Sequence, residues 1–216
     1  MQKDTIEITL ENQTLKNTKN LMFFSTLAYI VCPFVSAFSL LGAIGLLACV
    51  IMGLVGLYRF SKLAQTFVFK YCCFIFLAVF AYVLSSGFVL LSALDNPFHS
   101  LLFAIGGFVI VAIVCVYWAY CIAFEMSALT GRKEFITAFK LYMGGLVGIL
   151  SLIATNEITK AISIEQSGVS LYASSYVVFN SFAFMMLAVM LLAQILVALG
   201  IYRIEKIIVK NPQSSA

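Results

Sequence analysis

The segment Leu40-Leu-Gly-Ala-Ile-Gly-Leu-Leu-Ala-Cys-Val-Ile-Met-Gly-Leu-Val-Gly-Leu-Tyr58 contains no charged residue, and it is the second half of an uncharged run that begins at Leu21. The whole run is 38 residues long, whereas about 20 residues of α-helix cross the hydrocarbon core of a bilayer. Pro33, Gly42 and Gly45 interrupt it. The run is too long for one span, which predicts two membrane-inserted segments here.

The composition of the whole chain agrees with a membrane protein. Of its 216 residues, 63% are hydrophobic and 10% are charged, and the mean hydropathy is +1.08. Soluble domains have roughly 45–50% apolar and about 25% charged residues, so a water-soluble domain is excluded. The formal charge of +4 comes from cations at the ends of apolar runs. Because they form no basic stripe with interleaved aromatic residues, we exclude nucleic acid as a partner.

The apolar runs predict an all-α fold, a polytopic transmembrane helix bundle with six membrane-inserted segments, the first two forming a hairpin. The transmembrane domain is expected at residues 20–205, between a polar cytoplasmic tail at 1–19 and a cytoplasmic C-terminal tail at 206–216. The predicted segments are residues 20–37, 40–58, 71–94, 99–124, 138–155 and 175–202.

The positions of lysine and arginine predict the orientation, because short cytoplasmic loops carry an excess of cations. With six crossings, 12 of the 13 cations lie on the inner side and only Lys160 lies outside. With five crossings the split is 9 to 4. Six crossings therefore predict a multi-pass protein of the bacterial cytoplasmic membrane with both termini cytoplasmic. Segment 20–37 leaves three alternatives open: it spans, it re-enters as a half-helix, or it lies in the interface.

Small residues predict where helices touch, since they let helix backbones approach closely inside a bilayer. Gly45 and Gly53 lie two turns apart on the second segment, and Gly144 and Gly148 form a GxxxG pattern on the fifth. We expect these four glycines to pack helices. The pattern fits packing within the chain and also contact with a membrane-protein partner or a second copy.

Polar groups inside the predicted spans are few and uncharged. Asn180 and Gln194 lie fourteen residues apart, nearly four turns, and so on one helix face. With Ser85 and Ser86 they are candidates for lining a cavity or for joining helices by hydrogen bonds. Serine hydroxyls in helices can also bond the preceding turn. No converging carboxylates and no base beside a nucleophile occur, so we expect no catalytic residue, metal or cofactor.

Two further groups have alternative interpretations. Cys72, Cys73 and Cys121 are interpreted as small packing residues, or as an intramembrane thiol-redox site if two sulfurs reach disulfide distance. Thr130-Gly131 is typical of a helix stop. The cations that follow this helix stop are candidates for contacts with lipid head groups. The alternative interpretation is that they only set the membrane topology. They are Arg132, Lys133 and Lys140.

Residues 58–69 and 124–135 share a pattern of aromatic, Ser, Leu and Phe positions. It is explained either by an ancient duplication, relating segments two and three to four and five, or by chance in a Phe-rich chain.

The second of these stretches resembles a family of small prokaryotic multi-spanning membrane proteins classed as a domain of unknown function. The likeness covers residues 20–205 and implies a membrane protein without adding a site. It is carried by Glu125-Met-Ser-Ala-Leu129-Thr-Gly131, Phe135, Ala138, Leu141-Tyr142 and Gly144-Gly145.

From the residues we therefore expect an integral membrane protein that is not an enzyme and acts as an accessory or scaffold protein. The alternative is a small transporter or channel for a neutral or weakly polar solute. The lipid bilayer is its expected surrounding partner.

Overall fold

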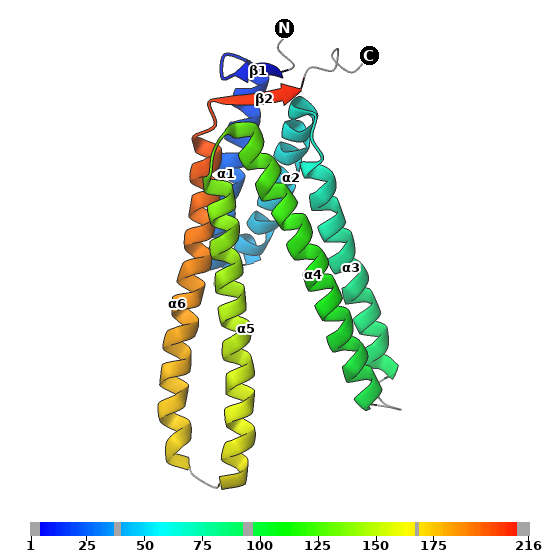
Figure 1. Ribbon diagram of the computed structural model, residues 1–216, viewed down its shortest axis with the longest axis vertical. Coiled ribbons are helices and arrows are strands. Elements are labelled where there is room, and N and C mark those ends of the chain that lie inside the picture. The colour runs from blue at the N-terminus through cyan, green and yellow to red at the C-terminus, as the bar shows by residue number, and fades with distance from the viewer. Residues whose placement is uncertain (1–4, 37–39, 93–96, 167–168, 211–216) are drawn as a thin grey trace.

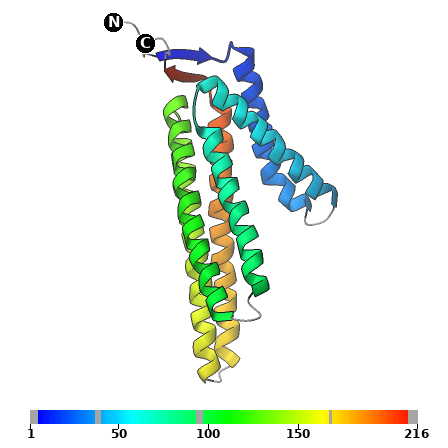
Figure 2. The same ribbon diagram turned by 90° about the vertical axis from the view of Figure 1, so that its right-hand side faces the viewer.

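The computed structural model describes residues 5–36, 40–92, 97–166 and 169–210. Neighbouring helices of this part pair along their length, and the three pairs diverge from one common end that carries a small sheet (Figures 1 and 2). The described elements are β1 (Thr5–Thr9), α1 (Gln13–Ser36), α2 (Leu40–Ala64), α3 (Val68–Ser92), α4 (Pro97–Thr130), α5 (Glu134–Gln166), α6 (Val169–Tyr202) and β2 (Lys206–Lys210).

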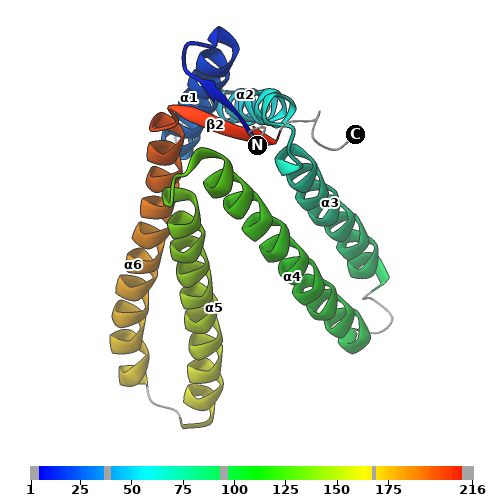
Figure 3. The same cartoon turned by 45° about the horizontal axis from the view of Figure 1, so that its top comes forward.

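The sheet joins the first and last described elements of the chain. β1 and β2 are antiparallel, and Ile8 pairs with Ile207. Because side chains alternate along a strand, Ile207 and its neighbour Val209 face the helices and are buried. Glu7 and Lys206 lie on the opposite face and form an ion pair at 3.1 Å. The sheet crosses the ends of the helices as a cover (Figure 3).

The buried core lies directly beneath this sheet. Its buried members come from all six described helices and from β2, because every helix pair meets the others at this end. Burying a large apolar side chain stabilises a fold by about 1.5–3 kcal/mol, so this cluster supplies the main cohesion between the three helix pairs. Its buried members are Leu15, Met22, Phe60, Ala64, Val68, Met126, Phe135, Ile201, Ile204 and Ile207.

Lys19 ties α1 to the end of α6. Its ammonium donates a hydrogen bond of 3.0 Å to the Ile204 carbonyl and lies over the Tyr202 ring. Carbonyls at a helix C-terminus have no partner within the helix and attract cations. Burial lowers the pKa of Lys19 below its ordinary value, Glu205 opposes this shift, and Arg132 reinforces it.

Two turns with the same backbone conformation connect successive helix pairs at the sheet end. α2 ends at Ala64 and the next residue, Gln65, has a left-handed φ of 53°. α4 ends at Thr130 and Gly131 has φ 67°, which confirms the predicted helix stop. The following helices also begin 66 residues apart, from Val68 to Glu134. The two stretches that share a sequence pattern therefore form the same turn.

Five described helices are long and apolar enough to cross a membrane. Their most apolar windows are only 6% to 17% buried inside the protein, so their apolar faces point outward, as a bilayer requires. α1 is not among the five. The spans are Ile44–Ala64, Val68–Gly87, Ile105–Thr130, Glu134–Ile153 and Asn180–Tyr202.

Some predicted boundaries differ from the structure. Residues 5–19 were expected in a polar tail, but they form β1 and the first turns of α1, because Asn12 caps that helix by accepting a hydrogen bond of 2.9 Å from the Thr14 amide. The C-terminal tail likewise begins with β2. Helical structure also extends α5 to Gln166 and begins α6 at Val169, although the predicted segments 138–155 and 175–202 leave residues 156–174 outside the membrane.

Residues 38–39 and 95–96, which lie between predicted segments, and the tail residues 1–4 and 211–216 lie outside the described residues.

Glycines determine how closely the two helices approach within the α1–α2 pair and within the α5–α6 pair. A Cβ added to Gly53 would lie 3.2 Å from the Ser25 Oγ, and one added to Gly148 would collide with Met186 of α6. Gly144 faces open space, and its neighbour Gly145 contacts α6 instead. Gly45 is half-buried on α2.

The two adjacent glycines of α5 provide a matched test. We predict that Gly145→Leu destabilises the protein by about 1–2 kcal/mol, because a Cβ there would lie 2.6 Å from the Met190 Cγ and 3.3 Å from the Met186 carbonyl oxygen. Gly144→Leu should be neutral or stabilise by up to about 1 kcal/mol, through helix propensity. Thermal unfolding midpoints of both variants in detergent measure the difference, and equal midpoints would contradict the observed packing.

Candidate functional site

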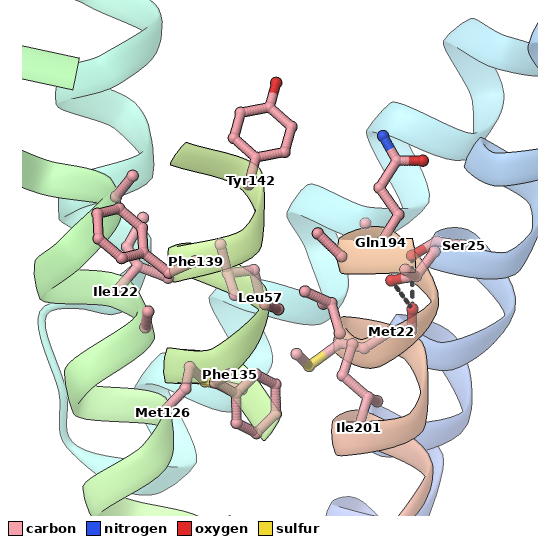
Figure 4. A pocket seen from close by; sticks show the side chains of 17 residues that line it. Met22, Ser25, Leu57, Ile122, Met126, Phe135, Phe139, Tyr142, Gln194 and Ile201 are labelled. Atoms are coloured by element: carbon pink, nitrogen blue, oxygen red, sulfur yellow. Dashed lines mark hydrogen bonds between the residues drawn. The ribbon is translucent and has the colours of Figure 1, made fainter. Parts of the chain in front are cut away.

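A cavity of about 340 Å³ lies between the helix pairs, next to the buried core (Figure 4). Its wall is mostly methyl, methylene and aryl groups. It is a candidate ligand site, since such sites are concave and apolar with a few placed polar groups. Residues of five helices line it, among them Met22, Gly53, Leu57, Ile122, Met126, Phe135, Ala193 and Ile201.

Two of the polar groups in the wall already have partners. The Ser25 and Thr26 hydroxyls both donate to the Met22 carbonyl, at 2.9 and 2.8 Å. Each hydroxyl oxygen can still accept a hydrogen bond. These two residues therefore offer a ligand acceptors rather than donors.

Two other polar groups mark one end of the cavity. The Gln194 amide and the Tyr142 hydroxyl lie there, whereas Met126 and Phe135 close the opposite end (Figure 4). Among the described residues, the Gln194 amide makes no hydrogen bond. Gln194 is partly buried in an otherwise apolar wall, so its amide can hydrogen-bond a ligand that enters the cavity.

The chemistry of the wall favours one class of ligand. No lysine, arginine, aspartate, glutamate or histidine is among the residues lining the cavity. A charged ligand would leave water without compensation there. The site suits a neutral, mostly apolar molecule that carries one hydrogen-bonding group.

The structure brings only one of the four polar candidates into this cavity. Gln194 lines it, and Asn180 lies nearly four turns away on α6. Ser85 and Ser86 lie on α3 and donate to carbonyls of their own helix, Tyr82 at 2.9 Å and Val83 at 3.0 Å.

The three cations predicted to contact lipid head groups lie in different environments. Arg132 forms an ion pair with Glu205 at 3.0 Å and is half-buried. Lys133 and Lys140 are exposed at the sheet end. Arg132 therefore serves first to hold the α4–α5 turn against the start of β2.

Sequence reasoning did not identify the contributions of α1 and α5. Ser25, Thr26 and Tyr142 enter the cavity only because α1 packs against α2 and α6, and α5 against α4 and α6. The available signal was that Ser25 and Thr26 lie adjacent in an otherwise apolar run.

Glu125 is a second group whose environment the sequence did not predict. It follows directly after the predicted segment 99–124, but it lies within the candidate span Ile105–Thr130 of α4. Tyr71 of α3 lies close to it, and its Oε2 atom is buried without a partner among the described residues. Ionisable groups at such places are costly.

Cys72, Cys73 and Cys121 are thiols, and no group of three or more His, Cys, Asp or Glu side chains gathers within the described part of the chain.

Filling the cavity should abolish ligand access. Ala193 is 2% exposed and lines the cavity, whereas Ala188 is exposed on the same helix. We predict that a small neutral aryl diazirine labels the lining residues of the native protein and of Ala188→Phe, but not those of Ala193→Phe. Peptide mass spectrometry maps the labelled residues, and thermal unfolding verifies that both variants fold. Equal labelling in both variants would show that the cavity is not a binding site.

Comparison of the chain with protein-family models, with curated protein sequences and with solved structures found no match. The resemblance to a family of small prokaryotic membrane proteins stays a prediction.

Proposed function

We propose that this chain is a non-enzymatic integral membrane protein that acts as an accessory or scaffold protein in the bacterial cytoplasmic membrane. The observation that carries this proposal is the distribution of its buried core. The core lies at the sheet end, while the spans are at most 17% buried in their most apolar windows. Apolar faces of this extent are available to lipid, to a membrane-protein partner or to a second copy.

The proposed layout has six crossings, with α1 as the first. The uncharged part of helix α1, Leu21–Ser36, has 16 residues, which at 1.5 Å each is about 24 Å, and a bilayer of roughly 30 Å can thin locally around such a short span. Helix α1 lies beside α2 and runs back along it (Figure 2). The pairing of β1 with β2 supports this layout, because an even number of crossings returns the chain to its starting side. A re-entrant α1–α2 pair would give the same sidedness.

The composition of the sheet end supports its placement on the cytoplasmic side. The last turn of α2, the turn after α4 and the start of β2 carry exposed cations, among them Lys62, Lys133 and Lys206. Aromatic side chains gather one to four turns below, where Tyr71 stacks on Trp118 with ring centroids 5.0 Å apart. Cations followed by an aromatic belt are typical of a cytoplasmic membrane interface.

This layout predicts which positions an impermeant reagent reaches. In a chain whose six native cysteines are replaced by alanine, single cysteines at Glu11, Lys133 and Lys206 should react with an impermeant maleimide only after the membrane is permeabilised. A cysteine at Gln166, at the far end of α5, should react in intact cells. Reaction of the Glu11 and Lys206 variants from opposite sides would contradict an even number of crossings.

One observation favours the alternative, a small transporter or channel for a neutral or weakly polar solute. The Gln194 amide stands without a partner at the end of the cavity and offers both a donor and an acceptor to such a solute.

Reconstitution separates the two functions. For an accessory protein we expect vesicles with the purified chain to show the same permeability to glycerol and urea as protein-free vesicles, measured by stopped-flow light scattering. Saturable flux that Gln194→Leu removes, and that the Asn180→Leu control retains, would overturn the accessory role and establish transport.

A further inference from the structure

A second cleft, whose lining includes two cations and three neutral polar residues, lies between α1 and α2 near the sheet end. It has a volume of about 600 Å³. Its lining residues are Thr14, Asn17, Thr18, Arg59, Lys62 and Leu63. No carboxylate is among them.

The register of the two helices explains why these residues converge. Positions i, i+3 and i+4 of a helix share one face. Thr14, Asn17 and Thr18 have this spacing on α1, and Arg59, Lys62 and Leu63 have it on α2. Since α1 and α2 pack along their length, the two faces oppose each other across the cleft.

The two cations of the cleft differ from others at this end. Arg132 and Arg203 each have a carboxylate at 3.0 or 3.1 Å. Arg59 and Lys62 form no ion pair with any residue that the structure describes, and both are exposed. Their positive charge is therefore available to an anion that enters the cleft.

The α1 side of the cleft supplies neutral hydrogen-bonding groups. Thr18 is only 1% exposed, yet its hydroxyl makes no hydrogen bond to the described residues although the residue lines the cleft. The Asn17 Oδ1 accepts from the Gln13 side chain at 3.3 Å, which directs the Asn17 amide donors elsewhere. These residues also lie in the first two turns of α1, at the positive end of its dipole.

We propose that this cleft binds a phosphate group, with Arg59 and Lys62 neutralising its charge and Thr18 and Asn17 donating hydrogen bonds to its oxygens. Arginine and lysine with neutral donors are the groups that proteins use for phosphate. The cleft lies at the end of the α2 span, which is the depth of lipid head groups. The volume exceeds that of one inorganic phosphate, so we assign the phosphodiester of an anionic phospholipid as the occupant.

The test uses the full chain, purified in a neutral detergent, with phosphatidylglycerol binding measured by native mass spectrometry. The double variant Arg59→Gln with Lys62→Gln should lower the affinity roughly 10- to 30-fold, as expected for two cations near an anionic lipid. The control, Lys16→Gln with Lys206→Gln, removes the same charge from exposed positions outside the cleft and should change the affinity less than about twofold. Equal losses in the two variants would overturn the proposal, because binding would then depend on net charge alone.

A variant that keeps the charge tests the location. Thr18→Val is nearly isosteric and should lower the affinity about three- to fivefold through one lost hydrogen bond. An unchanged affinity would overturn the placement of the phosphate in this cleft. Thermal unfolding midpoints verify that each variant folds.

Competition identifies the source of the phosphate group. Lipid binding that millimolar inorganic phosphate leaves unchanged supports the phospholipid assignment. Displacement of the lipid by inorganic phosphate, lost in the Arg59 and Lys62 variant, supports the same phosphate chemistry but overturns the lipid as its specific occupant. These readouts are independent of whether the protein acts as a scaffold or a transporter.

Discussion

The whole structure depends on the apolar packing beneath the two-stranded sheet. Each helix pair is held together along its length, but the pairs diverge from one another away from this end. Phe60 from α2, Phe135 from α5 and Ile204 from the start of the last connection are at most 5% exposed there. In water such a small core would not hold six long helices. In a bilayer it suffices, since lipid solvates the exposed apolar faces and each helix satisfies its own backbone hydrogen bonds.

Polar contacts give this packing its specificity. The Lys19 ammonium on the Ile204 carbonyl and the ion pairs of Arg132 and Arg203 each join elements that are far apart in the chain. Exposed ion pairs contribute little stability, about 0–1 kcal/mol. Their effect here is to fix which helix ends meet. This arrangement positions both the cationic cleft and the apolar cavity, which successive turns of α1 line.

Hydropathy and helix length were enough to predict the five long apolar helices, and Thr130-Gly131 was enough to predict where α4 ends. The strands could not be predicted, because Thr5–Thr9 and Lys206–Lys210 become a sheet only by pairing across the entire chain. The helical extensions of α5 and α6 were not predicted. Polar residues such as Asn156, Glu157 and Lys160 indicate the end of a membrane segment, but a helix can continue beyond the bilayer. The cavity could not be predicted, because it forms by the packing of α1 and α5 against other helices, which no local sequence pattern specifies. Of the four polar candidates, only Gln194 lines it.

The pairing of the first and last described strands has a consequence for biosynthesis. Glu7 and Lys206 are 199 positions apart, so β1 leaves the ribosome long before its partner exists. The apolar helices can enter the membrane one after another, but the sheet over their ends cannot form until translation has passed β2. If translation stops before β2, the sheet cannot form over the helix ends. The apolar core surface beneath it then stays exposed to chaperones and proteases of the cell.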